Sequence, residues 1–209
     1  MAVPGRRNGV MGDDDDDDEI LLDDGNALAE LDLEPDVPPH LRALFEAVET
    51  GNVDALRRAL DNHNGSIDEP VEDGDTVLHL ACLYGYFSCV QLLLERGASL
   101  EAKDEEGAIP LHDACASGFL EIVQYMLSFA SGPDVITRML NVTDTEGDTP
   151  LHHAARGEHL GVVRLLLAAG ASPMKINING KIPADLADQD TEVRSILTEA
   201  AAAADAVQC

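Results

Sequence analysis

The sequence predicts an all-α solenoid of about five helix-turn-helix repeats joined by short β-hairpin loops. Three observations lead to this fold class. Glycines recur at intervals of 33, 40 and 33 residues, at Gly74, Gly107, Gly147 and Gly180. A short common motif follows each glycine, and a second apolar segment with helical spacing follows the first three motifs. Self-similarity at this period is typical of stacked repeats, in which each unit buries its apolar face against the next.

The motif after each glycine predicts the first helix of a repeat. It reads TVLHLA at residues 76–81, IPLHDA at 109–114 and TPLHHA at 149–154, and it decays to IPADLA at 182–187. A threonine at the first position can cap the helix by accepting a backbone N–H, and a proline at the second position fits the first turn, where no donor is needed. The alanine at the last position is small, so a neighbouring repeat can stack against it.

The apolar segment after each motif predicts a second helix. Gly85 and Gly118 precede two of these segments, and glycine tolerates the positive φ of a tight turn. The fourth repeat has Gly157 and then Glu158 where the other repeats have this glycine. We therefore expect a rearranged turn and a locally less stable fourth repeat.

Seven extra residues separate the motif of the third repeat (109–114) from that of the fourth (149–154), in the stretch from Gly132 to Leu140. A Gly-Pro step followed by Val135, Ile136 and Met139 predicts a short extra helical turn. Two interpretations remain open at this point. The insertion is either a partner-specific projection or a neutral addition that covers its own apolar side on the stack.

The T-P-L-H-x-A signature, matched three times in phase, resembles the ankyrin repeat family over residues 40–199. The resemblance implies five repeats, of which the first and the last are polar caps. Their boundaries are expected near residues 40–72, 73–105, 106–145, 146–178 and 179–199. It also implies that the motif histidines, His79, His112 and His152, bond backbone groups of the neighbouring loop and are not metal ligands.

The two ends of the chain differ from the repeats. Residues 1–38 predict a disordered acidic tail, because the unbroken run from Asp13 to Asp18 repels itself and three prolines close the segment. Apolar residues between Ile20 and Leu33 are either a linear motif or a weak amphipathic turn. Residues 39–199 form the repeat domain, and residues 200–209 are expected to be a flexible tail.

The net charge of −27 restricts the classes of partner. Such a chain repels nucleic acid and anionic membranes, so we expect no direct contact with either and a basic protein surface as the attractive partner. No apolar run approaches the length of a membrane span, and no signal peptide is visible. The four cysteines lack C-x-x-C spacing and are interpreted as reduced thiols. We expect a monomer in the cytoplasm, the nucleus or both.

The sequence carries no catalytic signature, and we predict that the protein is not an enzyme. It has no G-x-S-x-G, no H-E-x-x-H and no phosphate loop ending in Lys-Ser or Lys-Thr. The aspartate run lacks the spacing of a calcium loop. We therefore expect no cofactor and no metal.

The candidate partner site lies on the hairpin tips and on the adjacent ends of the first helices, which the ankyrin resemblance implies are the usual contact surface. We expect seven acids to project from three successive tips with no base to offset them: Glu72, Asp73, Asp75, Glu105, Glu106, Glu146 and Asp148. Beside them Leu83, Tyr84 and Arg156 complete the predicted site. An acidic row next to a small aromatic step suits a Lys/Arg-rich segment that has an apolar anchor.

Two functional hypotheses follow. The first is a protein-interaction module that shields a basic client, as a chaperone or escort; in size and charge the chain resembles the small acidic ankyrin chaperones of a ribosomal protein, and histones or nuclear-localisation segments are equally basic clients. The second is a signalling or degradation adaptor or scaffold that recognises a target protein. Binding led by charge should weaken steeply with ionic strength, which distinguishes the two.

Overall fold

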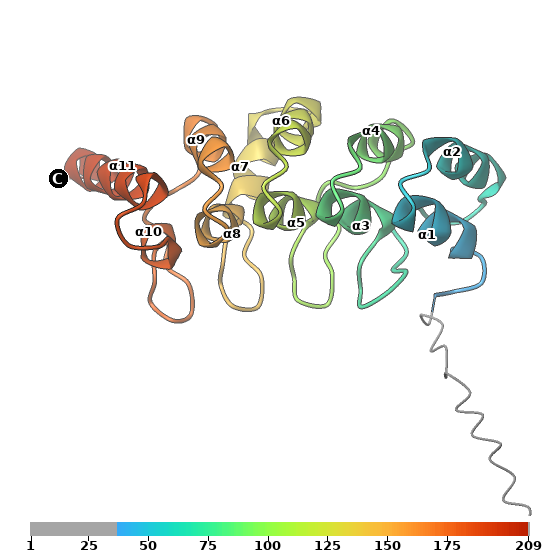
Figure 1. Cartoon of the computed structure of the whole chain (residues 1–209), viewed down its shortest axis with the longest axis horizontal. Helices are drawn as coiled ribbons and strands as arrows, with labels where there is room; N and C mark the ends of the chain where they lie inside the picture. The colour runs from blue at the N-terminus through green and yellow to red at the C-terminus, as the bar shows by residue number, and fades with distance from the viewer. Residues whose placement is uncertain (1–36, 209) are drawn as a thin grey trace, which may run out of the picture. The chain divides into compact units, whose positions relative to one another are not determined.

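Helix pairs stack side by side along residues 37–208, the part of the chain that the computed structural model describes. Figure 1 shows the first helices of the pairs in one row and the second helices in another, with loops extending beyond the first row. The first-row helices are α1 (Arg42–Glu49), α3 (Val77–Leu83), α5 (Pro110–Ala116), α8 (Pro150–Arg156) and α10 (Pro183–Leu186). The second-row helices are α2 (Val53–Asn62), α4 (Phe87–Glu95), α6 (Leu120–Phe129), α9 (Leu160–Ala168) and α11 (Glu192–Gln208).

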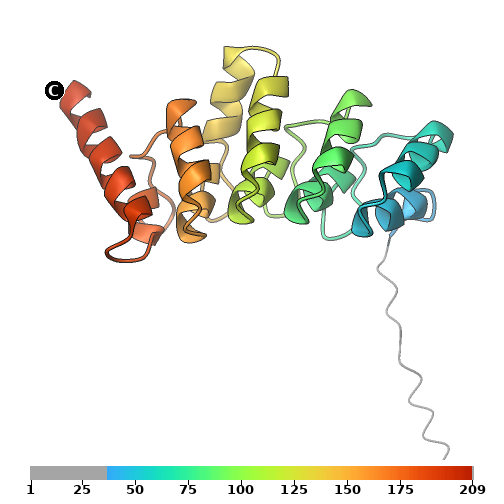
Figure 2. The same ribbon diagram turned by 45° about the horizontal axis from the view of Figure 1, so that its top comes forward.

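The core runs between the repeats. Each helix of the first row contacts its neighbours in that row, and the second-row helices contact one another in the same order, as Figure 2 shows. The motif alanines Ala81, Ala114 and Ala154 have no exposed surface, because the next first-row helix packs directly against them. The described residues thus confirm the predicted all-α stack. None of their helices is long and apolar enough to cross a membrane.

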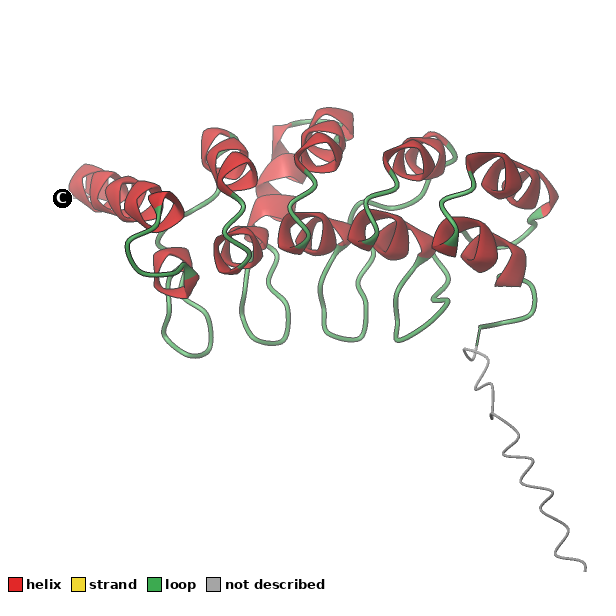
Figure 3. Cartoon of the chain, in the orientation of Figure 1, coloured by secondary structure: helices red, strands yellow, loops and turns green. Residues whose placement is uncertain are grey.

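The loops before α3, α5, α8 and α10, which we call the second to fifth fingers after their repeats, form no regular strands among the described residues. Within residues 37–208 they contain one isolated bridge, between Glu72 and Asp75, and Figure 3 draws the rest as loop. Backbone bonds join successive tips: Thr145 N–H donates to the carbonyl of Glu106 at 2.7 Å, and Ile178 N–H donates to that of Glu146 at 3.0 Å. The tips of the last three fingers therefore present one continuous strip.

The C-terminal end differs from the expectation. Residues 200–209 were expected to be a flexible tail, yet α11 continues to Gln208. The physical reason is the run of alanines, which have the highest helix propensity, together with a face that packs on the stack through Val193, Leu197 and Ala201. The expected acidic tail, residues 1–38, lies outside the described residues except for its last two positions, of which Val37 is buried in the core.

The turn of the fourth repeat is not rearranged. Glu158 adopts a φ of 57°, in the same left-handed region as Gly85 and Gly118, which both have a φ of 79°. Its carboxylate accepts a hydrogen bond from the backbone N–H of Asp188 at 2.6 Å, so the side chain links this turn to the last repeat. Glu158 therefore keeps the frame of the array although it is not glycine.

The insertion forms a helix of its own, α7 (Pro133–Asn141), which contacts α8. Met139 and Leu140 are buried, and Val135 and Ile136 are half-buried against the core. Arg138 donates two hydrogen bonds to the carboxylate of Glu101, at 2.9 and 3.0 Å. The insertion covers its own apolar side, which supports the second of the two interpretations.

Candidate functional site

The motif histidines hold the fingers to the helices. Nδ1 of His79 accepts the N–H of Thr76 at 3.1 Å, and Nε2 lies 3.4 Å from the carbonyl of Ala108 in the next finger. A neutral ring whose Nδ1 accepts must carry its proton on Nε2, so it has no lone pair left for a metal. Burial lowers the pKa of His79 and keeps the ring neutral. The contact with the next finger is the one that the resemblance implied.

His112 is the exception among these rings. Nδ1 accepts the N–H of Ile109 at 3.0 Å, but Nε2 is buried and has no hydrogen-bond partner. Its ring meets that of His153 edge-on at 5.4 Å. Burial, with a contribution from His153, lowers the pKa of His112 to about 4, so this ring is neutral at physiological pH.

The acids of the fourth finger are already neutralised by the chain itself. Asp148 has no exposed surface, whereas we expected it to project from the tip. Its carboxylate accepts hydrogen bonds from Arg156 and, at 2.7 Å, from the side-chain amide of Asn177. The guanidinium of Arg156 also lies 3.8 Å from the carboxylate of Glu146. The expectation that no base offsets the finger acids is therefore wrong for this finger, because the last turn of α8 places Arg156 over it.

A second group of acids has no such compensation. We call Asp75, Asp104 and Asp113 the acidic cluster. Carboxylate oxygens of Asp75 and Asp104 lie within 4.8 Å of each other, and one oxygen of Asp113 is buried without a hydrogen-bond partner. No ion pair reaches any of the three in the part of the chain that the structure describes.

Two members of the acidic cluster, Asp75 and Asp113, resist ionisation. Burial raises the pKa of Asp113 to about 8, and the charges of Asp75 and Asp104 act in the same direction. Burial likewise raises the pKa of Asp75, and the charges of Asp104 and Asp73 raise it further, to about 7. Asp104 is held in place because its Oδ1 accepts the N–H of Ala108 at 2.8 Å. A positive charge placed among these carboxylates would replace repulsion by attraction.

The repeat frame explains why a base compensates only one of the two acid groups. Arg156 stands at the position that Leu83 occupies in the second repeat and Ala116 in the third, at the C-terminal ends of α8, α3 and α5. Asp148 stands at the position of Asp75. The second repeat thus keeps this acid of the fourth but lacks its arginine, and the third repeat has Ala108 in place of the acid.

Neither acid group has the character of a metal centre. Side-chain atoms of Asp75, His79 and Asp104 lie within 4.8 Å of one another, but the lone pair of His79 is already used. In the other group, Asp144 bonds to His153 at 2.8 Å, and Asp148 is occupied by Arg156. The acidic cluster better suits a guanidinium or an ammonium group, as the internal pair of Arg156 and Asp148 illustrates.

A family model described as ankyrin repeats (3 copies) matches residues 21–104, 44–139 and 97–179. The chain belongs to the ankyrin repeat family. No protein in the curated comparison matches it. Ankyrin repeats generally mediate protein–protein interactions and are typically non-catalytic, so a protein partner is the functional expectation for this array.

The remaining predicted residues of this ankyrin array lie where a partner can reach them. Glu72, Asp73, Glu105 and Glu106 are exposed on the second and third fingers, as is Glu146 on the fourth. Leu83 and Tyr84 are 39% and 47% exposed. Leu83 is the last residue of α3 and Tyr84 is its C-cap, whereas Asp75 precedes the start of the helix, and seven helical residues rise about 10 Å. Leu83 and Tyr84 therefore lie beside the acidic cluster and not within it.

Sequence reasoning missed Asp104, Asp113 and Asn177. Asp113 follows the histidine in the motif of the third repeat, where the motif of the second repeat has Leu80. The sequence did offer a signal for Asp113, because a carboxylate stands there at a position that is apolar in the second repeat. Asp104 and Asn177 occupy corresponding positions, three residues before the finger glycine. Asn177 donates a hydrogen bond to Asp148 of the preceding finger, whereas Asp104 adds a second carboxylate beside Asp75. Only the fold shows these neighbours.

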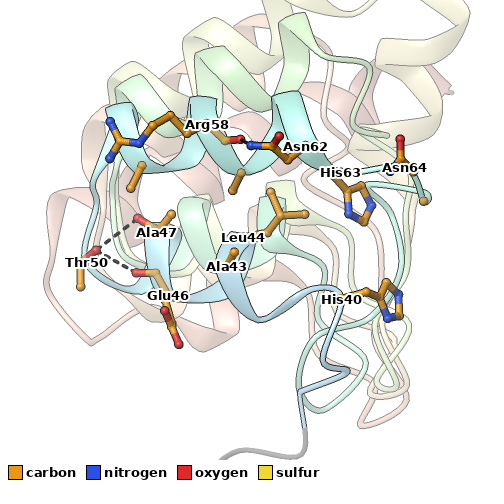
Figure 4. Close-up of a pocket in the computed structure, with 13 residues that line it drawn as sticks. His40, Ala43, Leu44, Glu46, Ala47, Thr50, Arg58, Asn62, His63 and Asn64 are labelled. Carbon is orange, nitrogen blue, oxygen red and sulfur yellow. Dashed lines mark hydrogen bonds between the residues drawn. The ribbon is translucent and has the colours of Figure 1, made fainter.

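A separate groove lies on the first ankyrin repeat. It has a volume of about 820 Å³ and lies against α1 and α2, with alanines and Leu44 along its floor. Figure 4 shows His40 and His63 at one end of it and Thr50 at the other. The opposite side of α1 packs on α3, so the groove marks the surface against which a preceding repeat would stack. Its lining offers no group of charges comparable with the acidic cluster.

Proposed function

We propose that this ankyrin array binds a protein segment rich in lysine or arginine through the acidic cluster and the exposed finger acids around it. The observation that carries the proposal is the contrast between equivalent positions of the array. Acids of the fourth repeat are paired with Arg156, whereas Asp75, Asp104 and Asp113 have no cationic partner among the described residues. A cationic side chain from a partner would pair with the acidic cluster as Arg156 pairs with Asp148.

An escort role for a basic client is consistent with this surface. The fingers are held by the repeat frame, so their acids are arranged before binding and little ordering entropy is lost. The net charge of −27 favours rapid encounter with a basic protein and screens its charge once bound. We propose that the client is a newly made or unassembled basic protein whose positive segment needs covering.

Neutralising the acidic cluster should weaken binding of a basic peptide at least tenfold. The probe is a fluorescent ten-residue peptide of alternating lysine and arginine, measured by anisotropy at 50 and 200 mM NaCl. Asp75→Asn with Asp113→Asn removes two acids of the cluster and keeps side-chain size. Glu95→Gln with Glu121→Gln removes two exposed acids from α4 and α6, in the second row, and is the matched control.

The proposal requires the first pair to weaken binding far more than the control pair, and to reduce its salt dependence. Equal losses in both variants would mean that only net charge matters. In that case the acidic cluster is not the binding site.

Removing the internal arginine should have the opposite effect on binding. Arg156→Leu gives the fourth repeat the residue of the second and leaves Asp148 with Asn177 alone. We expect the same peptide to bind more tightly, because a second acid group becomes available. We also expect a loss of about 1–3 kcal/mol in the free energy of unfolding, since a buried carboxylate loses its ionic partner while the arginine itself is half exposed. Peptide titration and urea unfolding measure the two effects, and weaker binding would contradict the proposed equivalence of the repeats.

A further inference from the structure

The tip of the fifth finger differs chemically from every tip before it. Ile176 and Ile178 are 62% and 72% exposed, and Met174 beside them is 39% exposed. The side chain of Asn177, between the two isoleucines, turns inward and bonds to Asp148, so its neighbours turn outward. Large apolar side chains gathered on an exposed tip are typical of contact surfaces and cost solubility if they remain uncovered.

The repeat frame does not demand isoleucine at these places. The corresponding positions are Lys103 and Glu105 in the third finger, and Thr143 and Thr145 in the fourth. All are compatible with the same loop. This tip is joined to the preceding finger by a backbone group, because the N–H of Ile178 donates to the carbonyl of Glu146. The apolar side chains are therefore free to serve a contact.

The charges around the isoleucines define what can cover them. Lys175 and Lys181 are exposed on the same finger, which carries no acid from Met174 to Lys181. Basic side chains of a partner are repelled here and attracted to the second and third fingers. Since the backbone bonds between tips make the last three fingers one strip, a single extended segment can contact both chemistries.

We propose that the partner segment is bipartite, with lysine or arginine at the acidic cluster and an apolar stretch at Ile176 and Ile178. This inference rests on the proposed function and adds the order of residues along the segment to it. The apolar stretch anchors the segment independently of salt, whereas the basic stretch supplies charge-led attraction. A segment with basic residues alone would contact the acidic cluster and leave Ile176 and Ile178 uncovered.

The test uses two fluorescent peptides that share one Lys/Arg block. In the first, a Leu-Phe-Leu stretch follows the block after a Gly-Ser spacer; in the second, Ser-Gly-Ser replaces that stretch. Anisotropy titrations at 150 mM NaCl compare the full chain with Ile176→Ser plus Ile178→Ser. Leu120→Ser plus Phe129→Ser, which removes two apolar residues about 40% exposed on α6, is the matched control. Circular dichroism verifies that each variant is folded.

We expect the parent to bind the first peptide at least tenfold more tightly than the second. The isoleucine variant should lose this preference and bind the second peptide as the parent does, while the control keeps the preference. An isoleucine variant that retains the preference overturns the inference. The proposed function fails separately, if Asp75→Asn with Asp113→Asn leaves the binding of both peptides unchanged.

Sedimentation equilibrium without peptide tests the competing occupant, a second copy of the chain. A parent protein that dimerises, together with an isoleucine variant that stays monomeric, would assign the fifth finger to self-association and overturn the bipartite segment. A parent that stays monomeric over the same concentration range supports it.

Discussion

Asp113→Asn should stabilise the folded protein at pH 8, because the native structure holds this carboxyl in its neutral form. Burial and the neighbouring carboxylates raise its pKa from 3.8 to about 8. The unfolded chain releases the proton near pH 4, so between about pH 4 and pH 8 the folded state binds a proton that the unfolded state lacks. The free energy of unfolding therefore falls as pH rises through this interval. Asparagine keeps the shape of the side chain and removes this dependence.

The expected effect is large. One pKa unit corresponds to about 1.4 kcal/mol, so even half of the rise in the pKa of Asp113 amounts to about 3 kcal/mol at pH 8. Thermal unfolding at pH 5, 6.5 and 8 measures it, and the advantage of the variant over the parent should grow with pH. Glu121→Gln, an exposed carboxylate on α6, should show no such growth. An advantage that is the same at pH 5 and at pH 8 would show that Asp113 ionises freely in the folded protein.

A variant that is more stable and yet binds less tightly would carry functional information. Keeping Asp75 and Asp113 protonated beside Asp104 destabilises the free protein at neutral pH, and a partner's cation would let these carboxyls ionise. Groups kept at such a cost are typical of binding and catalytic sites, where stability and function oppose each other. The carboxylates of the fourth repeat, which Arg156 already satisfies, should not behave in this way.

The second large effect concerns the turns between the two helix rows. We expect Gly118→Ala to lower the free energy of unfolding by about 3 kcal/mol. Gly118 has a φ of 79°, and an added Cβ would lie 2.3 Å from the ring of His159, which in turn is bonded to the carbonyl of Ala116 at 2.8 Å. The left-handed conformation costs a non-glycine residue about 1–2 kcal/mol, and overpacking adds about 1–3 kcal/mol.

Gly97→Ala separates these two contributions. Gly97 has a φ of 93° but meets no atom within 4 Å of an added Cβ, so its substitution costs only the backbone conformation. Urea unfolding of both variants should place the loss for Gly118 well above that for Gly97. Equal losses would mean that the ring of His159 moves aside without cost, and that the stack is looser at this point than its contacts indicate.

The same geometry explains why Glu158 is tolerated in the fourth repeat. Gly51, Gly85 and Gly118 each face a ring of the following repeat, from Tyr86, Phe119 and His159 respectively. At the corresponding place, directly before α11, the last repeat has Thr191, whose hydroxyl accepts the N–H of Arg194 at 3.2 Å instead. Without a ring above it, the position accepts a side chain at positive φ, and Glu158 uses that side chain to bond Asp188.

The sequence by itself determined the fold and the general surface. The phased motif predicted the helix pairs, because local rules of capping, glycine turns and small stacking residues apply within a single repeat. The family resemblance implied the contacts of His79 and His152 with the next finger, whereas Nε2 of His112 lacks the expected partner. The net charge and the run of acidic tips predicted an acidic surface, and five of the seven tip acids are exposed as expected.

The tertiary structure decided which of these acids remain available, because compensation depends on contacts between residues far apart in the chain. Asp148 is buried under Arg156 and Asn177, eight and 29 residues later in the chain. Asp75 gains two further carboxylates, Asp104 from the next finger and Asp113 from α5, and no cation. The local sequence pattern makes Asp75 and Asp148 look equivalent. Only the stacking of one repeat on the next gives Asp148 a basic partner and places Asp75 among other carboxylates.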